Sequence, residues 1–173
     1  MQLLFTMDQD DYFVGLPCLK RCAVRALIEQ EGKVLLMRSR DGMYKLPGGG
    51  IEQGEDHACA LARELLEETG LLLDEASLAP LGMVDERRRD YHDPRQNFVQ
   101  RSFYYACATH EAGLSPTLTQ NEQRLGLHAV WLPLAQAIDE NRRIAGGVHW
   151  MLRDTRFLET IRDIRQKKED ITP

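Results

Sequence analysis

Residues 46–71 read LPGGGIEQGEDHACALARELLEETGL and combine a glycine-rich loop with a helical pattern. Pro47 and the glycines after it exclude a helix interior or a regular strand at that point. From Asp56 to Thr69 apolar residues recur at helical spacing, which predicts one amphipathic helix. These residues are Ala58, Leu61, Ala62, Leu65 and Leu66. Gly70 follows as the predicted C-terminal stop of this helix.

Three carboxylates on the predicted helix point to metal chemistry. Glu64, Glu67 and Glu68 stand at i, i+3 and i+4, so their side chains share one face. On a solvated face such neighbours cost only about 0.2–0.5 kcal/mol per pair. Against a sheet they repel more strongly, and a divalent cation relieves that repulsion; hard oxygen ligands suit Mg²⁺ or Mn²⁺. Arg63, about 100° away around the helix, is better placed to anchor the loop through a carboxylate.

The same stretch resembles the signature of the Nudix hydrolase family, G-x5-E-x7-R-E-U-x-E-E-x-G-U, in which U is an aliphatic residue. All nine specified positions match, and they are Gly49, Glu55, Arg63, Glu64, Leu65, Glu67, Glu68, Gly70 and Leu71. The order of the flanking strands and the segment 131–134 extend the resemblance to about residues 18–141.

The resemblance implies an α+β fold, namely an α/β/α sandwich with a mixed β-sheet and a loop–helix–loop catalytic motif. It implies that water attacks a phosphorus of a nucleoside diphosphate linked to another group, such as a nucleoside triphosphate, oxidised or not, or a nucleotide sugar. Carried over by position, the metal ligands for Mg²⁺ or Mn²⁺ are Glu64, Glu67 and Glu68, helped by the Gly48 carbonyl. Glu64 and Glu68 are also candidates for taking the proton of the water. The structural positions of the motif are Gly49, Glu55, Arg63 and Gly70, with Glu55 fixing the start of the helix.

Several Nudix enzymes recruit a further glutamate from a loop outside the signature, which makes Glu122 a candidate catalytic residue. It lies in the long connection that precedes a strand predicted at 128–132. A solvated loop residue is the alternative interpretation of Glu122. Glu52 and Glu86 are secondary candidates for the same task.

The densest basic group flanks a loop predicted at 90–97. Arg87, Arg89 and Arg95 are candidates for holding a far phosphate of the substrate, and Tyr91 is a candidate for stacking on its base. A hairpin end with solvated arginines is the alternative. The positions beyond the signature match no pattern specific to a substrate subfamily.

The remaining elements follow from apolar patterning. The runs at 21–28 and 33–38 predict a hairpin across a turn at 29–32. Further strands are predicted at 81–89, 98–109 and 128–132, with a long connection at 112–126 and a helix from 133 to about 141. An amphipathic helix is predicted at about 150–168, with Arg153, Arg156, Arg162 and Asp163 on its polar side. We expect this helix to pack on the core, a homodimer contact being the alternative.

Length and composition fit one domain over 1–173, with a core at about 18–141 followed by that last helix. Hydrophobic residues make up 43% and charged residues 28%, and the formal net charge is −5. The acidic balance argues against a nucleic-acid polymer or a membrane surface as partner, and no apolar run approaches the roughly 20 residues that span a bilayer. We therefore expect a small-molecule nucleotide substrate and a cytoplasmic location. A catalytically silent Nudix domain, acting as a nucleotide sensor or binding a partner, is the alternative function, and the intact signature acids favour the enzyme.

Overall fold

Strand β2 (Cys18–Leu27) carries an apolar run that sets the arrangement of the sheets. The structure is a computed structural model and describes residues 1–144 and 148–169. β2 pairs in parallel with β7 (Asn97–Glu111) along its whole length. From Ala23 onwards every residue of β2 is buried, because other elements cover both of its faces.

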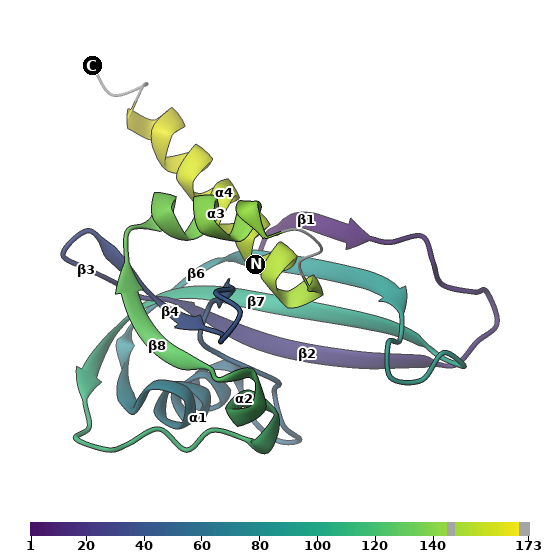
Figure 1. Ribbon diagram of the computed structural model, residues 1–173, viewed down its shortest axis with the longest axis horizontal. Coiled ribbons are helices and arrows are strands. Elements are labelled where there is room, and N and C mark those ends of the chain that lie inside the picture. The colour runs from purple at the N-terminus through teal and green to yellow at the C-terminus, as the bar shows by residue number, and fades with distance from the viewer. Residues whose placement is uncertain (145–147, 170–173) are drawn as a thin grey trace.

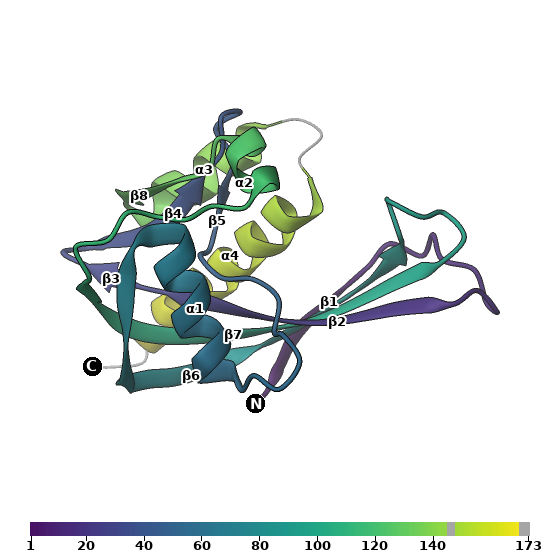
Figure 2. The ribbon, with the colours of Figure 1, turned by 90° about the horizontal axis from the view of Figure 1, so that it is seen from below.

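The larger sheet has four strands in the order β1-β6-β7-β2 and is mixed. β1 (Leu3–Asp8) runs parallel to β6 (Leu71–Arg89), whereas β6 and β7 form a long antiparallel pair. Both strands of that pair are longer than predicted, and the loop expected at 90–97 joins them. Figure 2 shows that these four strands project together beyond the helices at one end.

The smaller sheet is antiparallel and is built around β4. Its strands are β3 (Glu29–Gln30), β4 (Lys33–Arg38), β5 (Tyr44–Lys45) and β8 (His128–Leu132). The predicted hairpin between 21–28 and 33–38 is therefore wrong. On its N-terminal side β4 pairs with β3 and with Ile28, whose carbonyl accepts from the Leu35 N–H at 3.0 Å, and not with β2. β2 instead satisfies its backbone groups along its full length against β7.

Helix α1 (His57–Thr69) forms where the sequence predicts a helix. Its N-cap is Asp56, whose carboxylate accepts from the Cys59 N–H at 2.8 Å. Gly70 ends it in the left-handed conformation, with φ at +71°, and its N–H donates to the Leu66 carbonyl. The stop signal read from the sequence is thus the actual C-terminal cap.

Helix α2 (Gln120–Leu125) occupies part of the segment that was predicted to be an irregular connection at 112–126. It is only six residues long and has no buried residues, so apolar periodicity cannot reveal it. A capping box marks it instead: Thr119 accepts from the Glu122 N–H, and the Glu122 carboxylate accepts from the Thr119 N–H. This capping box is the sequence signal that periodicity arguments overlook.

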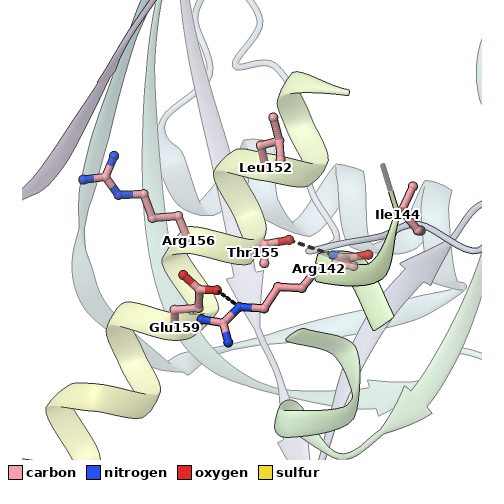
Figure 3. Close-up of a pocket in the computed structure, with 7 residues that line it drawn as sticks. Arg142, Ile144, Leu152, Thr155, Arg156 and Glu159 are labelled. Atoms are coloured by element: carbon pink, nitrogen blue, oxygen red, sulfur yellow. Dashed lines mark hydrogen bonds and ion pairs between the residues drawn. The ribbon is translucent and has the colours of Figure 1, made fainter. Parts of the chain in front are cut away.

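Helices α3 (Leu134–Arg143) and α4 (His149–Glu169) pack against each other. Figure 3 shows the groove between them, about 370 Å³ in volume, with Arg142 reaching across to Glu159 at 2.6 Å. Residues 145–147 and 170–173 of the predicted single domain lie outside the described residues.

The helices cover two separate apolar cores on opposite sides of the strands (Figure 1). The core under α1 includes Val24, Ala26, Leu35, Leu61 and Leu65. The core under α3 and α4 includes Leu27, Val84, Ile138, Phe157 and Leu158. This arrangement is the predicted α/β/α sandwich, and the α+β class is confirmed. No helix in the described ranges is long and apolar enough to cross a bilayer.

Arg153 is a correction to the predicted polar side of α4. The sequence pattern places it toward solvent, but it is only 3% exposed. Its Nε donates to the Tyr104 hydroxyl at 3.2 Å and to Asp154 Oδ1 at 3.0 Å. A buried arginine is tolerated here because the sheet and the helix supply acceptors for it.

The docking of α4 can be tested with two leucines on that helix. Leu158 is fully buried, whereas Leu152 is 43% exposed. We expect Leu158→Ala to lower the free energy of unfolding by about 2–5 kcal/mol, because it leaves a cavity. Leu152→Ala should cost less than about 1 kcal/mol. Urea unfolding followed by circular dichroism measures both values, and equal losses would contradict the docking of α4 on the sheet.

Candidate active site

The glycine loop lies along the edge of β2 that β7 leaves free. Val24 N–H donates to the Gly49 carbonyl at 2.9 Å, and Ala26 N–H donates to the Pro47 carbonyl at 3.0 Å. Gly48 has φ at +125°, and a Cβ there would overlap the Val24 carbonyl oxygen. Only glycine therefore allows this close approach of two backbones.

Glu68 lies beneath the loop and is 1% exposed. Its Oε1 accepts from Lys45 Nζ at 2.5 Å, and its Oε2 accepts from the Gly48 N–H at 2.7 Å. Burial raises the pKa of the Glu68 carboxyl, while Lys45 and the Gly48 N–H oppose that rise. The Gly48 group that faces Glu68 is thus its N–H, and Lys45 was not anticipated from the sequence.

Arg63 joins the helix to the loop through Glu55. Its Nε and Nη2 donate to the two Glu55 oxygens at 2.7 and 2.9 Å, and Nη2 also donates to the Gly50 carbonyl at 2.9 Å. The Arg63 hydrogen bonds lower the pKa of Glu55 to about 2, and the same contact raises the pKa of Arg63. The two-point geometry holds the loop against the helix.

Arg63 also reaches the carboxylate face, which the angular separation around the helix did not suggest. Its Nη1 lies 2.9 Å from Glu64 Oε1 and 3.3 Å from Glu67 Oε2. The length of the arginine side chain makes this reach possible. Glu64 in turn lies against the loop, because a Cβ on Gly49 would overlap its carboxylate.

Glu122 is brought to the same place by the connection before β8. The Thr117 N–H donates to the Glu67 carbonyl at 2.8 Å and attaches this connection to the end of α1. Burial of Glu122 opposes its ionisation, but hydrogen bonds from Thr119, the charge of Lys45 and a contact with Glu68 outweigh it, so its pKa lies below the usual range. Glu122 is therefore a neighbour of Glu68 as well as a helix cap.

The predicted phosphate-binding arginines lie elsewhere. Arg89 donates twice to the Pro94 carbonyl, and Arg95 pairs with Asp93 at 2.9 Å. Figure 2 shows their loop at the projecting end of the strands, well away from α1. Tyr91 belongs to the same loop, Arg87 lies two residues before the end of β6, and both are exposed. The structure does not bring these four residues to the carboxylates.

The two secondary glutamates also differ in position. Glu52 is exposed in the loop, and its N–H donates to Glu55. Glu86 is 2% exposed and pairs with Arg88 at 2.8 Å, on the side of the sheet covered by α4. Two arginines of β2 were missed altogether: Arg21 lies against Gly50, and Arg25 is 5% exposed. Arg25 could have been found from the sequence, because it is the one charged residue inside the apolar run at 23–28.

The donor set is suited to a hard cation, although the site also contains its own cations. Glu64, Glu67 and Glu68 offer carboxylate oxygens alone, which are ligands that Mg²⁺ and Mn²⁺ accept. Arg63 and Lys45 now lie among these oxygens and supply the positive charge. In the described ranges, no three His, Cys, Asp or Glu side chains already converge into a cage for an ion. The chemistry of these residues fits a divalent cation. Such an ion would take the place of Arg63 Nη1 beside Glu64 and Glu67.

The comparison with known families settles what this loop and helix belong to. A family model described as the NUDIX domain matches residues 19–151. The chain belongs to the Nudix family. Nudix hydrolases generally use divalent metal ions, in keeping with the donor set of this site.

The curated relatives match about half of this Nudix chain, and the chain covers about half to three fifths of their length. An ADP-ribose pyrophosphatase of Methanocaldococcus jannaschii is 40% identical over 85 residues, which is 47% of each protein. The nucleoside triphosphatase NudI of Escherichia coli is 36% identical over 87 residues, or 46% of this chain and 62% of the relative. A solved NUDIX hydrolase from Nitrosomonas europaea has a TM-score of 0.58 at 21% identity, over 87% of this chain and 91% of its own. That last likeness shows the Nudix fold.

Gly48 and Gly54 allow a test of the contact between loop and strand. Both have positive φ, but only a Cβ at Gly48 meets backbone, whereas the space at Gly54 is open. We expect Gly48→Ala to lower the free energy of unfolding by at least about 2 kcal/mol, and Gly54→Ala by about 1 kcal/mol from backbone strain alone. Chemical denaturation measures both. Equal losses would show that the backbone contact with Val24 is unimportant.

The Arg63–Glu55 contact predicts a dependence of stability on pH. The pKa of Glu55 is about 2 in the folded chain and near 4.5 without its partner. Between these values the unfolded state binds the proton more readily, so the contribution is complete above about pH 4.5 and is lost as the pH falls toward 2. We expect Glu55→Gln to make the free energy of unfolding less dependent on pH in that window. An unchanged slope would exclude the contact as its source.

Proposed function

We propose that this Nudix chain hydrolyses a pyrophosphate linkage in a nucleoside diphosphate linked to another group, by attack of water on phosphorus. The observation that carries the proposal is the meeting of Glu64, Glu67 and Glu68 with Glu122 beside a glycine loop. The names of two relatives, an ADP-ribose pyrophosphatase and a nucleoside triphosphatase, support the same reaction class. Nucleoside triphosphates, oxidised or not, and nucleotide sugars fall within it.

We propose that the carboxylates of α1 hold Mg²⁺ or Mn²⁺, with the Gly48 carbonyl as a further ligand. A bound divalent ion supplies positive charge to phosphate oxygens and lowers the pKa of a water molecule. If the ion displaced Arg63 Nη1 from Glu64 and Glu67, Arg63 would still hold the loop, because its Nε and Nη2 donate to Glu55 independently of Nη1. Lys45 opposes the rise that burial causes in the pKa of Glu68 and pairs with its carboxylate.

Glu122 is the proposed acceptor of the water proton. Its Oε2 caps α2 through both Thr119 contacts, which fixes the side chain without using Oε1. Its contact with Glu68 supports a position beside the carboxylates that we propose to bind the metal. Glu64 and Glu68 are the alternative acceptors, but Glu64 is bonded to Arg63 and Glu68 to Lys45 and Gly48.

The substitution Glu122→Gln separates the two tasks of this residue. Glutamine also serves at this position of a capping box, so α2 should stay capped, but it cannot take a proton. We expect turnover to fall more than about tenfold with little change in the free energy of unfolding. Release of phosphate and pyrophosphate from a nucleotide panel with Mg²⁺ measures turnover. Glu111→Gln, at an exposed position on β7, is the matched control.

Two outcomes would contradict the proposal at different points. Near-normal turnover in Glu122→Gln would show that Glu122 only caps α2. The proposed acceptor of the water proton would then be Glu64 or Glu68. If the unaltered protein turned over no member of the panel but still bound nucleotides, the chain would instead be a nucleotide sensor.

A further inference from the structure

One short segment, from Tyr44 to Gly48, supplies both groups that hold the buried carboxylate of Glu68. Lys45 Nζ donates to Glu68 Oε1 at 2.5 Å, and the Gly48 N–H donates to Glu68 Oε2 at 2.7 Å. Glu68 is one of the carboxylates that we propose to bind the metal. The position of this carboxylate therefore depends on whatever fixes the backbone of the segment.

Strand β5 begins the segment and is paired with another strand on one side only. Its partner is β4, and within the described residues the smaller sheet ends at β5. The other edge of β5 lies against the helices α3 and α4. Tyr44 and Leu46 are buried there, and buried backbone N–H and C=O groups are costly to leave unpaired. Partners for this edge must come from the two helices.

Side chains of α3 and α4 take the place of a neighbouring strand. Asn141 of α3 accepts from the Tyr44 N–H at 2.9 Å and donates to the Tyr44 carbonyl at 3.0 Å, in the way a residue of a paired strand does. Two residues further along, Asp154 of α4 accepts from the Leu46 N–H at 3.0 Å. The backbone is thus fixed immediately before and immediately after Lys45.

Asn141 and Asp154 are themselves held from several directions. Asn141 Nδ2 also donates to Thr155 Oγ1 at 2.8 Å. The Tyr104 hydroxyl and Arg153 Nε both donate to Asp154 Oδ1 at 3.0 Å. Both residues are buried, where apolar side chains would fill the space without the cost of desolvating polar groups. Their polar atoms are therefore used for holding the backbone and not only for packing.

The alternation of side chains transmits this hold to the carboxylate. Tyr44 and Leu46 lie in the core under α3 and α4, so Lys45 between them points to the opposite face, where Glu68 lies. Pro47 follows directly and restricts the backbone of Leu46 to an extended conformation. Lys45 cannot turn away from Glu68 unless the hydrogen bonds to the helices break.

We propose that Asn141 and Asp154 are positioning residues, which fix residues 44–46 so that Lys45 stays against Glu68. The bearing of this contact on the metal site rests on the proposed function, whereas the hold on Lys45 does not. Contacts behind a metal ligand touch neither the ion nor the substrate, yet their loss typically changes metal affinity or activity by about 10–100-fold.

Chemical labelling of lysines tests the hold on Lys45 without substrate or metal. Acetic anhydride and mass spectrometry give its rate of acetylation relative to the exposed Lys33 of the same chain. We expect Asn141→Ala to raise this relative rate at least about fivefold, because the segment then opens locally. Ile138→Ala is the matched control, since Ile138 is fully buried on the same helix and forms no side-chain hydrogen bond. It should lower the stability and change the rate less than about twofold.

Turnover provides a second measurement, which does depend on the proposed function. Asn141→Ala should lower kcat at least about tenfold and change KM less than about threefold, because Asn141 touches no substrate. Ile138→Ala should keep both values close to those of the unaltered chain. Faster labelling of Lys45 with an unchanged kcat would overturn the link between this hold and Glu68.

Native-state hydrogen exchange of the unaltered chain covers the case in which Asn141→Ala fails to fold. The Tyr44 and Leu46 amides should open together with those of α4, with the same dependence on denaturant. Exchange of these two amides independently of α4 would overturn the proposal, and so would equal labelling of Lys45 in the two alanine variants. Faster labelling in a chain that hydrolyses nothing would refute the proposed hydrolysis and leave the hold on Lys45 standing.

Discussion

The contact between β2 and the glycine loop is the constraint on which the rest of the site depends. β7 occupies one edge of β2, and the loop occupies the other through Val24, Ala26 and the Cys22 carbonyl. The loop can come this close only because Gly48 has no side chain. One strand thereby organises both faces, since Val24 lies in the core under α1 and Leu27 lies in the core under α3 and α4.

Charge balance is the second constraint, and it explains why so many acidic groups can gather on one helix. Lys45 pairs with the buried Glu68, and Arg63 shares its guanidinium among Glu55, Glu64 and Glu67. Buried charges are tolerated only when they are paired, so loss of either cation would leave an uncompensated carboxylate. The carboxylates of α1 are thus balanced by two different cations of the protein, Lys45 and Arg63.

The sequence predicts the local parts of this molecule and misses the parts made by distant segments. The helix over 57–69, its Gly70 stop and the strand at 128–132 follow from periodicity and capping within a few residues. The hairpin expected from 21–28 and 33–38 is wrong because β2 finds a better partner in β7, which no local pattern announces. Arg153 was assigned to solvent for the same reason, since Tyr104 and Asp154 satisfy it only after the sheet and α4 meet. Glu122 could be proposed by position, but its contact with Glu68 depends on how the preceding connection folds back onto α1.

These distant pairings also determine the order in which the molecule can assemble. The Leu46 N–H donates to the carboxylate of Asp154, which lies 108 positions further along the chain. β2 likewise pairs with β7, which comes much later in the sequence. Contacts of such long sequence separation make folding slow, because large loops must close before any contact forms. During synthesis the glycine loop and α1 emerge after β2 but well before β7 and α4. The segment that leads into the glycine loop therefore reaches its final arrangement only after α4 has brought Asp154 to Leu46.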